Sequence, residues 1–361
     1  QMCIRDSVFA DPQALADLNA LVHPVVMRDF DAWAARQEGS YVILESAILF
    51  EAGLEGSVDK TVAVLAPREL RIERTCRRDG GGADLSRPQV MAILNVTPDS
   101  FFAGSRMPDA PHVERRVREA VAEGASIIDV GGYSSRLGAD EVSPGEEWRR
   151  VELGVEAVRR LAPGMAVSVD TFRSEVAARA IERFGPLIIN DISAGELDPA
   201  MPAVAAKYGV PYIAMHMKGD PKTMQSLTDY KRDITAEVVA YFEARVAALL
   251  AAGIAREHLV LDPGFGFAKT TEQNYELLAG LHRLCALGYP VLAGLSRKSM
   301  IYRVLGVTPA QSLAGTVALG WECLRQGAAI LRVHDVREAV DTVRIFNAYV
   351  QNSGEICQMK K

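Results

Sequence analysis

Eight short runs of β-branched and aliphatic residues alternate with helical stretches along the C-terminal part of the chain, and no other feature constrains the fold as strongly. The runs span residues 90–94, 127–130, 166–169, 187–189, 212–215, 259–261, 291–293 and 330–333. Strands that alternate with helices predict parallel pairing. Eight such units over roughly 260 residues match the size of a closed barrel. We therefore predict an α/β fold of the (β/α)8 TIM barrel type.

Helix-start signals support this alternation. Ser143-Pro144-Gly145-Glu146 and Thr308-Pro309-Ala310-Gln311 each have the order of a capping box with proline at the first helical position. Asp198-Pro199 predicts the start of a further helix in the same way. Apolar residues recur every three or four positions from Val176 to Phe184, which predicts one helical stripe packed on the barrel.

Charge and cysteine usage exclude several classes of protein. Lys and Arg number 40 against 46 Asp and Glu, so the chain lacks the basic excess of a nucleic-acid binder. Its 5 cysteines never form a C-x-x-C pair, which argues against a disulfide framework or zinc site and favours the cytoplasm. The longest apolar stretch, residues 246–255, is too short to span a bilayer. We expect small-molecule substrates, and neither nucleic acid nor a membrane as a partner.

A glycine-rich seam divides the chain. Residues 80–87 are predicted to be a linker, because consecutive glycines are followed there by polar residues. The barrel is expected to occupy residues 88–350, followed by a tail over 351–361. Residues 1–7 lack the apolar core of a signal peptide, and we interpret them as a lead that is not native to the protein. Residues 8–79 form a separate N-terminal segment.

Polar and ionisable residues stand where the predicted strands end, which is the end of a barrel that carries its active site. They are Asn95, Asp129, Asp170, Asn190, Asp191, His216, Asp262, Ser296, Arg297, Lys298, Arg332 and His334. Singly, each has a structural alternative. Aspartate and asparagine form turns or helix caps, lysine and arginine cover surfaces, and a lone histidine is more often structural. Their concentration at one rim favours a functional site.

These side chains form two chemical groups. One combines carboxylates, an amide and an ammonium, which suits the donor and acceptor edges of a flat heterocycle such as a guanine-like or pterin ring. Its members are Asp170, Asn190, Asp262 and Lys298. The other combines guanidinium, imidazole and amide groups that suit a phosphate or pyrophosphate. Its members are Arg136, Arg332, His334 and Asn95. Because Arg332 and His334 are two residues apart on one strand end, both should point the same way.

Ordered motifs from Arg87 to about Val350 resemble the dihydropteroate synthase family. They are Ile93–Phe101, Asp129–Gly132, Ser134–Arg136, Val169–Thr171, Ile189–Asp191, Asp262–Phe267, Ser296–Ser299 and Arg332–Asp335. The resemblance covers the whole predicted barrel. It implies a transferase of folate biosynthesis that joins 6-hydroxymethyl-7,8-dihydropterin pyrophosphate to 4-aminobenzoate, with 7,8-dihydropteroate and pyrophosphate as products.

The resemblance also implies roles for individual residues. The catalytic residues would be Asn95, Lys298, Arg332 and His334. The substrates would be bound by Thr97, Pro98, Ser135, Arg136, Asp170, Asn190, Met215, Asp262, Phe267, Lys298, Arg332 and His334. Asn95 would hold Mg²⁺ next to the pyrophosphate. Because the family commonly forms dimers, the resemblance also allows for a homodimer.

Three positions depart from the family pattern. Ala103 stands in the first loop where the family usually carries an aspartate, Tyr133 stands where many members carry glutamate, and Leu137 stands where proline usually follows the arginine. We expect activity to survive, since the pocket residues are intact. Two other functions remain open from the residues. One is a pterin-binding methyltransferase-type barrel, which carries a methyl group rather than displacing pyrophosphate. The other is a pterin-binding barrel without catalysis.

Residues 8–79 resemble the later part of dephospho-CoA kinase, which implies a partial α/β extension before the barrel. The resemblance rests on Val22–Pro24, Tyr41–Glu51, Val58–Val64 and Pro67–Arg74. A kinase of this type needs a glycine-rich phosphate-binding loop, and the sequence encodes none. We interpret the segment as truncated, and the residues leave open whether the fusion is natural or an assembly artefact.

Overall fold

The computed structural model describes residues 22, 25–37, 39, 41–42, 57–60, 85, 87–97, 110–134 and 141–353. The chain divides into two units, residues 1–67 and 68–361. In the first unit, residues 25–34 form a helix. Most of the kinase-like strands expected within 41–51 and 58–64, and most of the expected linker at 80–87, lie outside the described residues; residues 41–42 and 58–60, which are described, are not in a strand.

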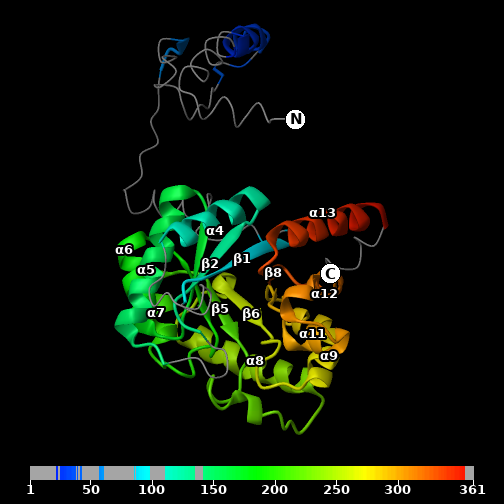
Figure 1. The fold of residues 1–361 in the computed structure, drawn as a ribbon. Helices are drawn as coiled ribbons and strands as arrows, with labels where there is room; N and C mark the ends of the chain where they lie inside the picture. The colour runs from blue at the N-terminus through cyan, green and yellow to red at the C-terminus, as the bar shows by residue number, and fades with distance from the viewer. Residues whose placement is uncertain are drawn as a thin grey trace. The chain divides into compact units, whose positions relative to one another are not determined.

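Eight parallel strands in the second unit form one sheet with the order β6-β5-β4-β3-β2-β1-β8-β7 (Figure 1). They are β1 (Gln89–Asn95), β2 (Ile127–Gly131), β3 (Ala166–Asp170), β4 (Ile188–Asp191), β5 (Tyr212–Met215), β6 (Leu259–Asp262), β7 (Leu292–Ala293) and β8 (Ile330–Val333). A parallel bridge between Leu261 and Val291 links β6 to β7 and closes the ring. The predicted TIM barrel is confirmed.

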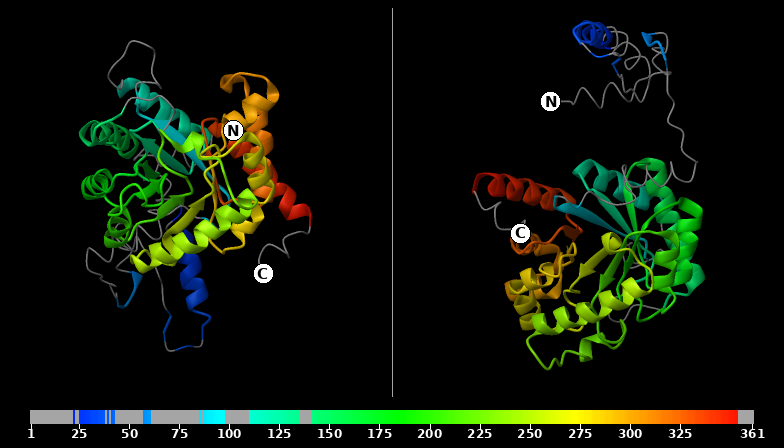
Figure 2. Two further views of the ribbon diagram at one scale, coloured as in Figure 1. Left: turned by 90° about the horizontal axis from the view of Figure 1, so that it is seen from below. Right: turned by 180° about the vertical axis from the view of Figure 1, so that it is seen from behind.

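Helices lie outside the strands, as the two further views show (Figure 2). They are α4 (Ala110–Glu123), α5 (Pro144–Leu161), α6 (Ser174–Phe184), α7 (Met201–Tyr208), α8 (Ile234–Ala251), α9 (Thr271–Ala279), α10 (Leu281–Cys285), α11 (Ser299–Leu305), α12 (Leu313–Arg325) and α13 (Val336–Ser353). Short 3-10 turns lie at Met224–Ser226, Arg256–His258 and Pro309–Gln311. None of the helices in the described part of the chain has the length and apolar content to cross a membrane.

The strands are buried on both faces, which explains why their sequences are continuous apolar runs. Facing outward, residues such as Val130, Val169 and Leu261 pack against the helices in the main core. Facing inward, each strand contributes one side chain to an apolar layer that we call the apolar floor. It consists of Met91, Ile127, Ala166, Ile188, Ile213, Val260, Leu292 and Ile330. This layer fills the barrel, so that any site must lie above it.

The helix starts follow the predictions only in part. Ser143 caps α5 by accepting a hydrogen bond from the Glu146 nitrogen, but the Glu146 carboxylate binds Arg149 and Arg150 instead of completing a capping box. Thr308 forms both halves of its box. The prediction for Asp198 holds in part. Helix α7 begins at Met201, after a turn in which Asp198 Oδ1 accepts from the Ala200 nitrogen at 3.0 Å, and Asp198 Oδ2 accepts from the first residue of α6.

Candidate active site

Strand geometry places a group of polar side chains directly above the apolar floor. Successive side chains on a strand point to opposite faces, so residues two positions beyond the floor also point into the barrel. At the C-terminal mouth these residues include Asp129, Asn190, Met215, Asp262 and Arg332. On β3 the floor residue is Ala166, and Asp170, four residues further along the strand, points into the barrel by the same alternation. Side chains from six strands therefore converge on one region.

Arg332 joins two carboxylates that come from neighbouring strands. Its Nε donates to Asp129 Oδ2 at 2.6 Å, and its Nη2 donates to Asp170 Oδ2 at 2.7 Å. Asn190 Nδ2 donates to the same Asp129 oxygen at 3.0 Å. The Asp129 side chain is fully buried, and its Oδ1 has no hydrogen-bond partner among the described residues. Since loss of one partner would leave buried charge uncompensated, this cluster needs all its members.

Burial shifts the pKa values of the charged groups at the mouth. It raises the pKa of Asp170 to about 7, although the attraction of Arg332 opposes the shift. It lowers the pKa of Lys298 to about 8, and the nearby Asp262 carboxylate opposes that change. Burial also raises the pKa of Asp262, against the attraction of Lys298. These groups influence one another because they share a poorly solvated region.

The loop after β6 holds Asp262 beside Lys298. Asp262 Oδ1 accepts a hydrogen bond from the Gly264 nitrogen at 2.7 Å. Gly264 has a φ of +69°, and a Cβ at this position would lie 2.1 Å from the His216 carbonyl oxygen, so only glycine fits. Lys298 Nζ donates to the carbonyl of Phe265 and lies 4.6 Å from the centre of the Phe267 ring. The loop therefore presents a carboxylate and an aromatic face to one ammonium group.

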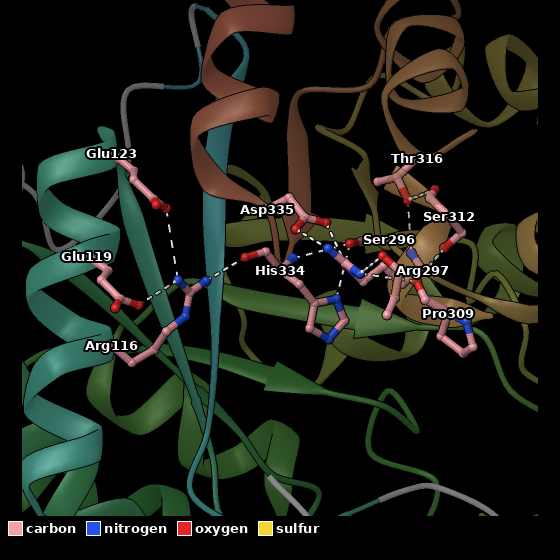
Figure 3. Close-up of polar contacts among 11 residues, drawn as sticks. Arg116, Glu119, Glu123, Ser296, Arg297, Pro309, Ser312, Thr316, His334 and Asp335 are labelled. Atoms are coloured by element: carbon pink, nitrogen blue, oxygen red, sulfur yellow. Dashed lines mark hydrogen bonds and ion pairs between the residues drawn. The ribbon is translucent and has the colours of Figure 1, made fainter. Parts of the chain in front are cut away.

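Ser296 and His334 contact each other between the loops that follow β7 and β8 (Figure 3). Ser296 Oγ lies 3.1 Å from His334 Nδ1 and accepts from the His334 backbone nitrogen at 3.2 Å. Asn95 ends β1, and a Cβ on the adjacent Gly131 would lie 3.3 Å from Asn95 Oδ1 and 3.7 Å from the Asp170 side chain. The bare glycine thus keeps the space between these two side chains open.

The structure places most of the predicted site residues at this mouth. The residues brought together there are Asn95, Asp170, Asn190, Asp262, Phe267, Ser296, Lys298, Arg332 and His334. Met215 is buried beside Ile192, Met217 and Met224, which form an apolar wall that Phe267 extends. Thr97 is buried just beyond β1. Pro98, Ser135 and Arg136 lie outside the described residues.

Arg332 and His334 have different neighbours, although they were expected to point the same way. Arg332 contacts the two carboxylates, whereas His334 contacts Ser296. Period-two alternation fixes the direction of Cβ, and the long arginine side chain then reaches across the barrel toward opposite charge. The guanidinium group therefore joins the carboxylates, and the imidazole stays with the loop hydroxyl.

Two strand-end residues have structural roles. Asp191 faces outward from β4 and accepts hydrogen bonds from the Ser193 nitrogen and hydroxyl, the Gly195 nitrogen and the Tyr212 hydroxyl. His216 is buried, with Nδ1 3.0 Å from Lys269 Nζ, and its ring packs edge-on against Tyr241. Asp191 and His216 therefore stabilise the fold, which was the structural alternative for such strand-end residues.

Sequence reasoning left two residues out of the site. Asp129 stood among the strand-end residues, but it was not assigned to the binding group, although its position on a strand end was the available signal. Lys269 is buried in the loop after β6, where its Nζ donates to the carbonyls of Gly264 and Phe267 at 3.0 Å. Nothing in its sequence context distinguishes it from a surface lysine.

The arrangement can bind a flat polar ring at one side and an anion at the other. Carboxylate, amide and ammonium groups face the ring position, and the serine–histidine pair with Asn95 faces the anion position. A fold and a mouth of this kind define a class of barrel enzymes that bind pterins. Residues 91–334 match the family described as pterin binding enzymes, which is more than half of the chain.

Comparison with known proteins specifies the family further. The dihydropteroate synthase of Escherichia coli strain K12 is 45% identical over 269 residues, covering 74% of this chain and 94% of the relative. That of Haemophilus influenzae is 43% identical over 265 residues, covering 73% and 95%. The crystal structure of the Yersinia pestis dihydropteroate synthase with a sulfonamide drug complex has a TM-score of 0.70 and 42% identity, covering 74% of this chain and 96% of that one. This chain belongs to the dihydropteroate synthase family.

A second match concerns the N-terminal segment. Residues 2–98 match the dephospho-CoA kinase family. This finding supports the kinase-like resemblance of the segment before the barrel. The barrel and the segment are therefore related to two different families.

Proposed function

We propose that the chain condenses 6-hydroxymethyl-7,8-dihydropterin pyrophosphate with 4-aminobenzoate to give 7,8-dihydropteroate and pyrophosphate. The observation that carries the proposal is the convergence of Asp170, Asp262 and Lys298 around Arg332 at one mouth. Xanthomonas albilineans dihydropteroate synthase, solved with 4-aminobenzoic acid, has a TM-score of 0.67 and 42% identity, covering 74% of this chain and 94% of that one. The chemistry of this mouth suits the same substrate class.

The carboxylate-rich part of the mouth suits the pterin ring. Ionised Asp170 and Asp262 accept hydrogen bonds from ring N–H groups, and the Asn190 amide can both donate and accept. Lys298 donates from its ammonium to a ring carbonyl. The apolar wall around Met215 provides a surface for the face of the ring. These contacts fix the orientation of the carbon that carries the leaving group.

The loops after β7 and β8 suit the leaving pyrophosphate. Departure of pyrophosphate from a carbon attached to an electron-rich ring creates positive charge on the pterin and negative charge on the leaving group. The carboxylates stabilise the first and the His334 side stabilises the second, because fixed polar groups in a poorly solvated site need no reorganisation. The arylamine of 4-aminobenzoate is a neutral nucleophile, so the reaction requires no strong base.

Asn95 is the proposed ligand for Mg²⁺. Its amide oxygen faces the open space beside Gly131, and Mg²⁺ typically binds few protein oxygens together with substrate phosphates and water. The described residues contain no cluster of three or more His, Cys, Asp or Glu side chains that could hold a metal alone. The residues thus fit an ion that binds mainly through the pyrophosphate. When bound, it supplies positive charge at the leaving group.

We also propose a homodimer and a cytoplasmic location. Helices α11 and α13 expose the large apolar residues Val304, Leu305, Ile345 and Tyr349, and a second copy of the chain would cover such side chains. Among the described residues, Cys285 and Cys323 carry free thiols, which suits a reducing compartment. Sedimentation equilibrium of the purified protein tests the dimer.

A steady-state assay tests the activity. The purified protein is mixed with the pterin pyrophosphate, 4-aminobenzoate and Mg²⁺, and both dihydropteroate and released pyrophosphate are measured. We expect equal amounts of the two products, with loss of turnover when Mg²⁺ is chelated. Pterin binding without either product would overturn the proposal and favour a non-catalytic barrel. Methyl transfer from a methylated pterin would favour the methyltransferase-type alternative.

A further inference from the structure

Arg297 and Asp335 have no part in the chemistry above, yet each is adjacent to residues that do. Arg297 lies between Ser296 and Lys298 in the loop after β7, and Asp335 follows His334 in the loop after β8. Figure 3 shows the two side chains directed at each other between these loops. Their contact therefore joins two loops that carry proposed catalytic groups.

Arg297 makes an unusually complete set of contacts. Its Nε donates to Asp335 Oδ2 at 2.8 Å and its Nη2 donates to Asp335 Oδ1 at 2.6 Å, which is a two-point ion pair. Its Nη1 donates to the carbonyls of Pro309 and Ala310 at 3.1 and 2.7 Å. Its backbone nitrogen donates to Thr316 Oγ1 at 3.1 Å. We call the Arg297–Asp335 pair with these contacts the clasp.

The backbone of Arg297 is held in a conformation that an arginine rarely adopts. Its φ is +55°, in the left-handed region that favours glycine. Such a conformation persists only where the surroundings determine it, and it tends to occur at functional sites. Here it reverses the chain, so that the Lys298 nitrogen bonds back to the Leu295 carbonyl at 3.1 Å. The side-chain contacts of the clasp oppose the local strain.

His334 is held by contacts from two other parts of the barrel. Ser296 contacts its imidazole, and Arg116 of α4 donates to its carbonyl at 2.5 Å (Figure 3). Arg116 is itself paired with Glu119 at 3.5 Å and Glu123 at 3.9 Å. The position of the imidazole thus depends on polar contacts that reach it from α4 and from the loop after β7.

We propose that the Arg297–Asp335 clasp positions Ser296 and His334 for the pyrophosphate of the substrate. This inference rests on the proposed function, because that function supplies the anion. The two clasp residues are positioning residues: their charges neutralise each other and their side chains point away from the mouth. Loss of the clasp should weaken anion binding more than pterin binding, because three of the four pterin-binding groups, Asp170, Asn190 and Asp262, lie on strands.

The experiment compares two ligands on the same proteins. Calorimetry measures the Kd of inorganic pyrophosphate and the Kd of 6-hydroxymethylpterin, which lacks phosphate, for the wild-type chain, Arg297→Lys and Asp335→Asn. We expect each variant to lose roughly tenfold in pyrophosphate affinity and less than twofold in pterin affinity. The double variant should lose no more than the worse single variant, because both substitutions break one interaction. Equal losses for both ligands, or no loss for pyrophosphate, would overturn the proposal.

Two further variants separate positioning from stability. Arg297→Gly relieves the positive φ and removes the clasp, so it should fold and still show the selective loss of pyrophosphate affinity. Arg325→Lys is the matched control, since Arg325 makes a two-point ion pair with Glu322 on the surface of α12. It should bind both ligands as the wild type does. Normal pyrophosphate binding by Arg297→Gly would overturn the clasp even where the wild type forms dihydropteroate, whereas a wild type without product would count only against the proposed function.

Discussion

The carboxylate side of the mouth and its anion-binding side are held in place by different means. The carboxylate side consists of Asp129, Asp170, Asn190 and Asp262, which all lie on strands. The anion-binding side consists of Ser296 and His334, which follow the short strand β7 and the end of β8. Backbone pairing fixes the first group directly. The second depends on side chains that tie one loop to another, so it can be disturbed without unfolding the barrel.

Arg332 pairs with two carboxylates of the carboxylate side, and its replacement should have the largest effect. Arg332→Met leaves the buried Asp129 and the partly buried Asp170 without an ion-pair partner, at a cost of about 3–5 kcal/mol of stability. Catalysis should fall by roughly two to three decades, because a preorganised charge at the pterin is lost. Urea denaturation and the rate of dihydropteroate formation measure the two effects.

Arg325→Met is the control for this substitution. Arg325 also makes a two-point contact with a carboxylate, but its side chain is 59% exposed. An exposed pair contributes only about 0–1 kcal/mol. If both variants lose the same stability, burial does not distinguish the two pairs, and the carboxylate side is not the rigid charged cluster described above.

Neighbouring residues on β4 allow a sharper comparison within the carboxylate side. Asp191→Ala removes an outward acceptor of four hydrogen bonds and should cost about 3 kcal/mol of stability, because buried donors lose their partner. Asn190→Ala removes an inward group and should instead weaken pterin binding by roughly tenfold. Thermal unfolding and calorimetric titration with 6-hydroxymethylpterin measure these effects. The opposite ranking would contradict the inward and outward assignments.

The same strand illustrates what the sequence could and could not predict. Continuous apolar runs predicted all eight strands, because a buried parallel sheet needs apolar side chains on both faces. Polar residues at their ends predicted the mouth. The chemical grouping selected Asn190 rather than Asp191 for the site, and β4 turns Asn190 inward, but the sequence did not show that Asp191 accepts four hydrogen bonds outside the barrel. The roles of Arg297 and Lys269 depend on contacts with distant segments, which local pattern does not contain.

The pH dependence of catalysis should report two charged groups at the mouth. Asp170 must be ionised to accept hydrogen bonds, so kcat/KM should fall as the pH drops below its pKa of about 7. Lys298 must be protonated, so kcat/KM should also fall as the pH rises above its pKa of about 8. Each limb should approach tenfold per pH unit. A profile that is flat from pH 6 to 9 would contradict these assignments.

Lys298→Arg tests the alkaline limb separately. A guanidinium group stays protonated at these pH values, so this limb should move well above pH 8 while the acidic limb remains. Lys222→Arg is the control, because Lys222 is exposed and pairs with the exposed Glu141 rather than with a mouth residue. It should leave both limbs unchanged. An unaltered alkaline limb in Lys298→Arg would assign that limb to another group.

The smallest predicted effect concerns Lys269, which supports the loop of the carboxylate side. Burial lowers its pKa from 10.5 to about 7, so between these values the unfolded chain binds one proton more than the folded chain. Stability therefore rises with pH in this range, by up to about 1.4 kcal/mol per unit from this group. In Lys269→Met that contribution to the slope should disappear, whatever stability is lost from its hydrogen bonds. Urea denaturation between pH 7 and 9 measures the slope, and Lys231→Met, at an exposed position, should retain it. Equal slopes for Lys269→Met and the wild type would mean that Lys269 stays protonated in the folded protein, and that its three contacts solvate an ammonium group.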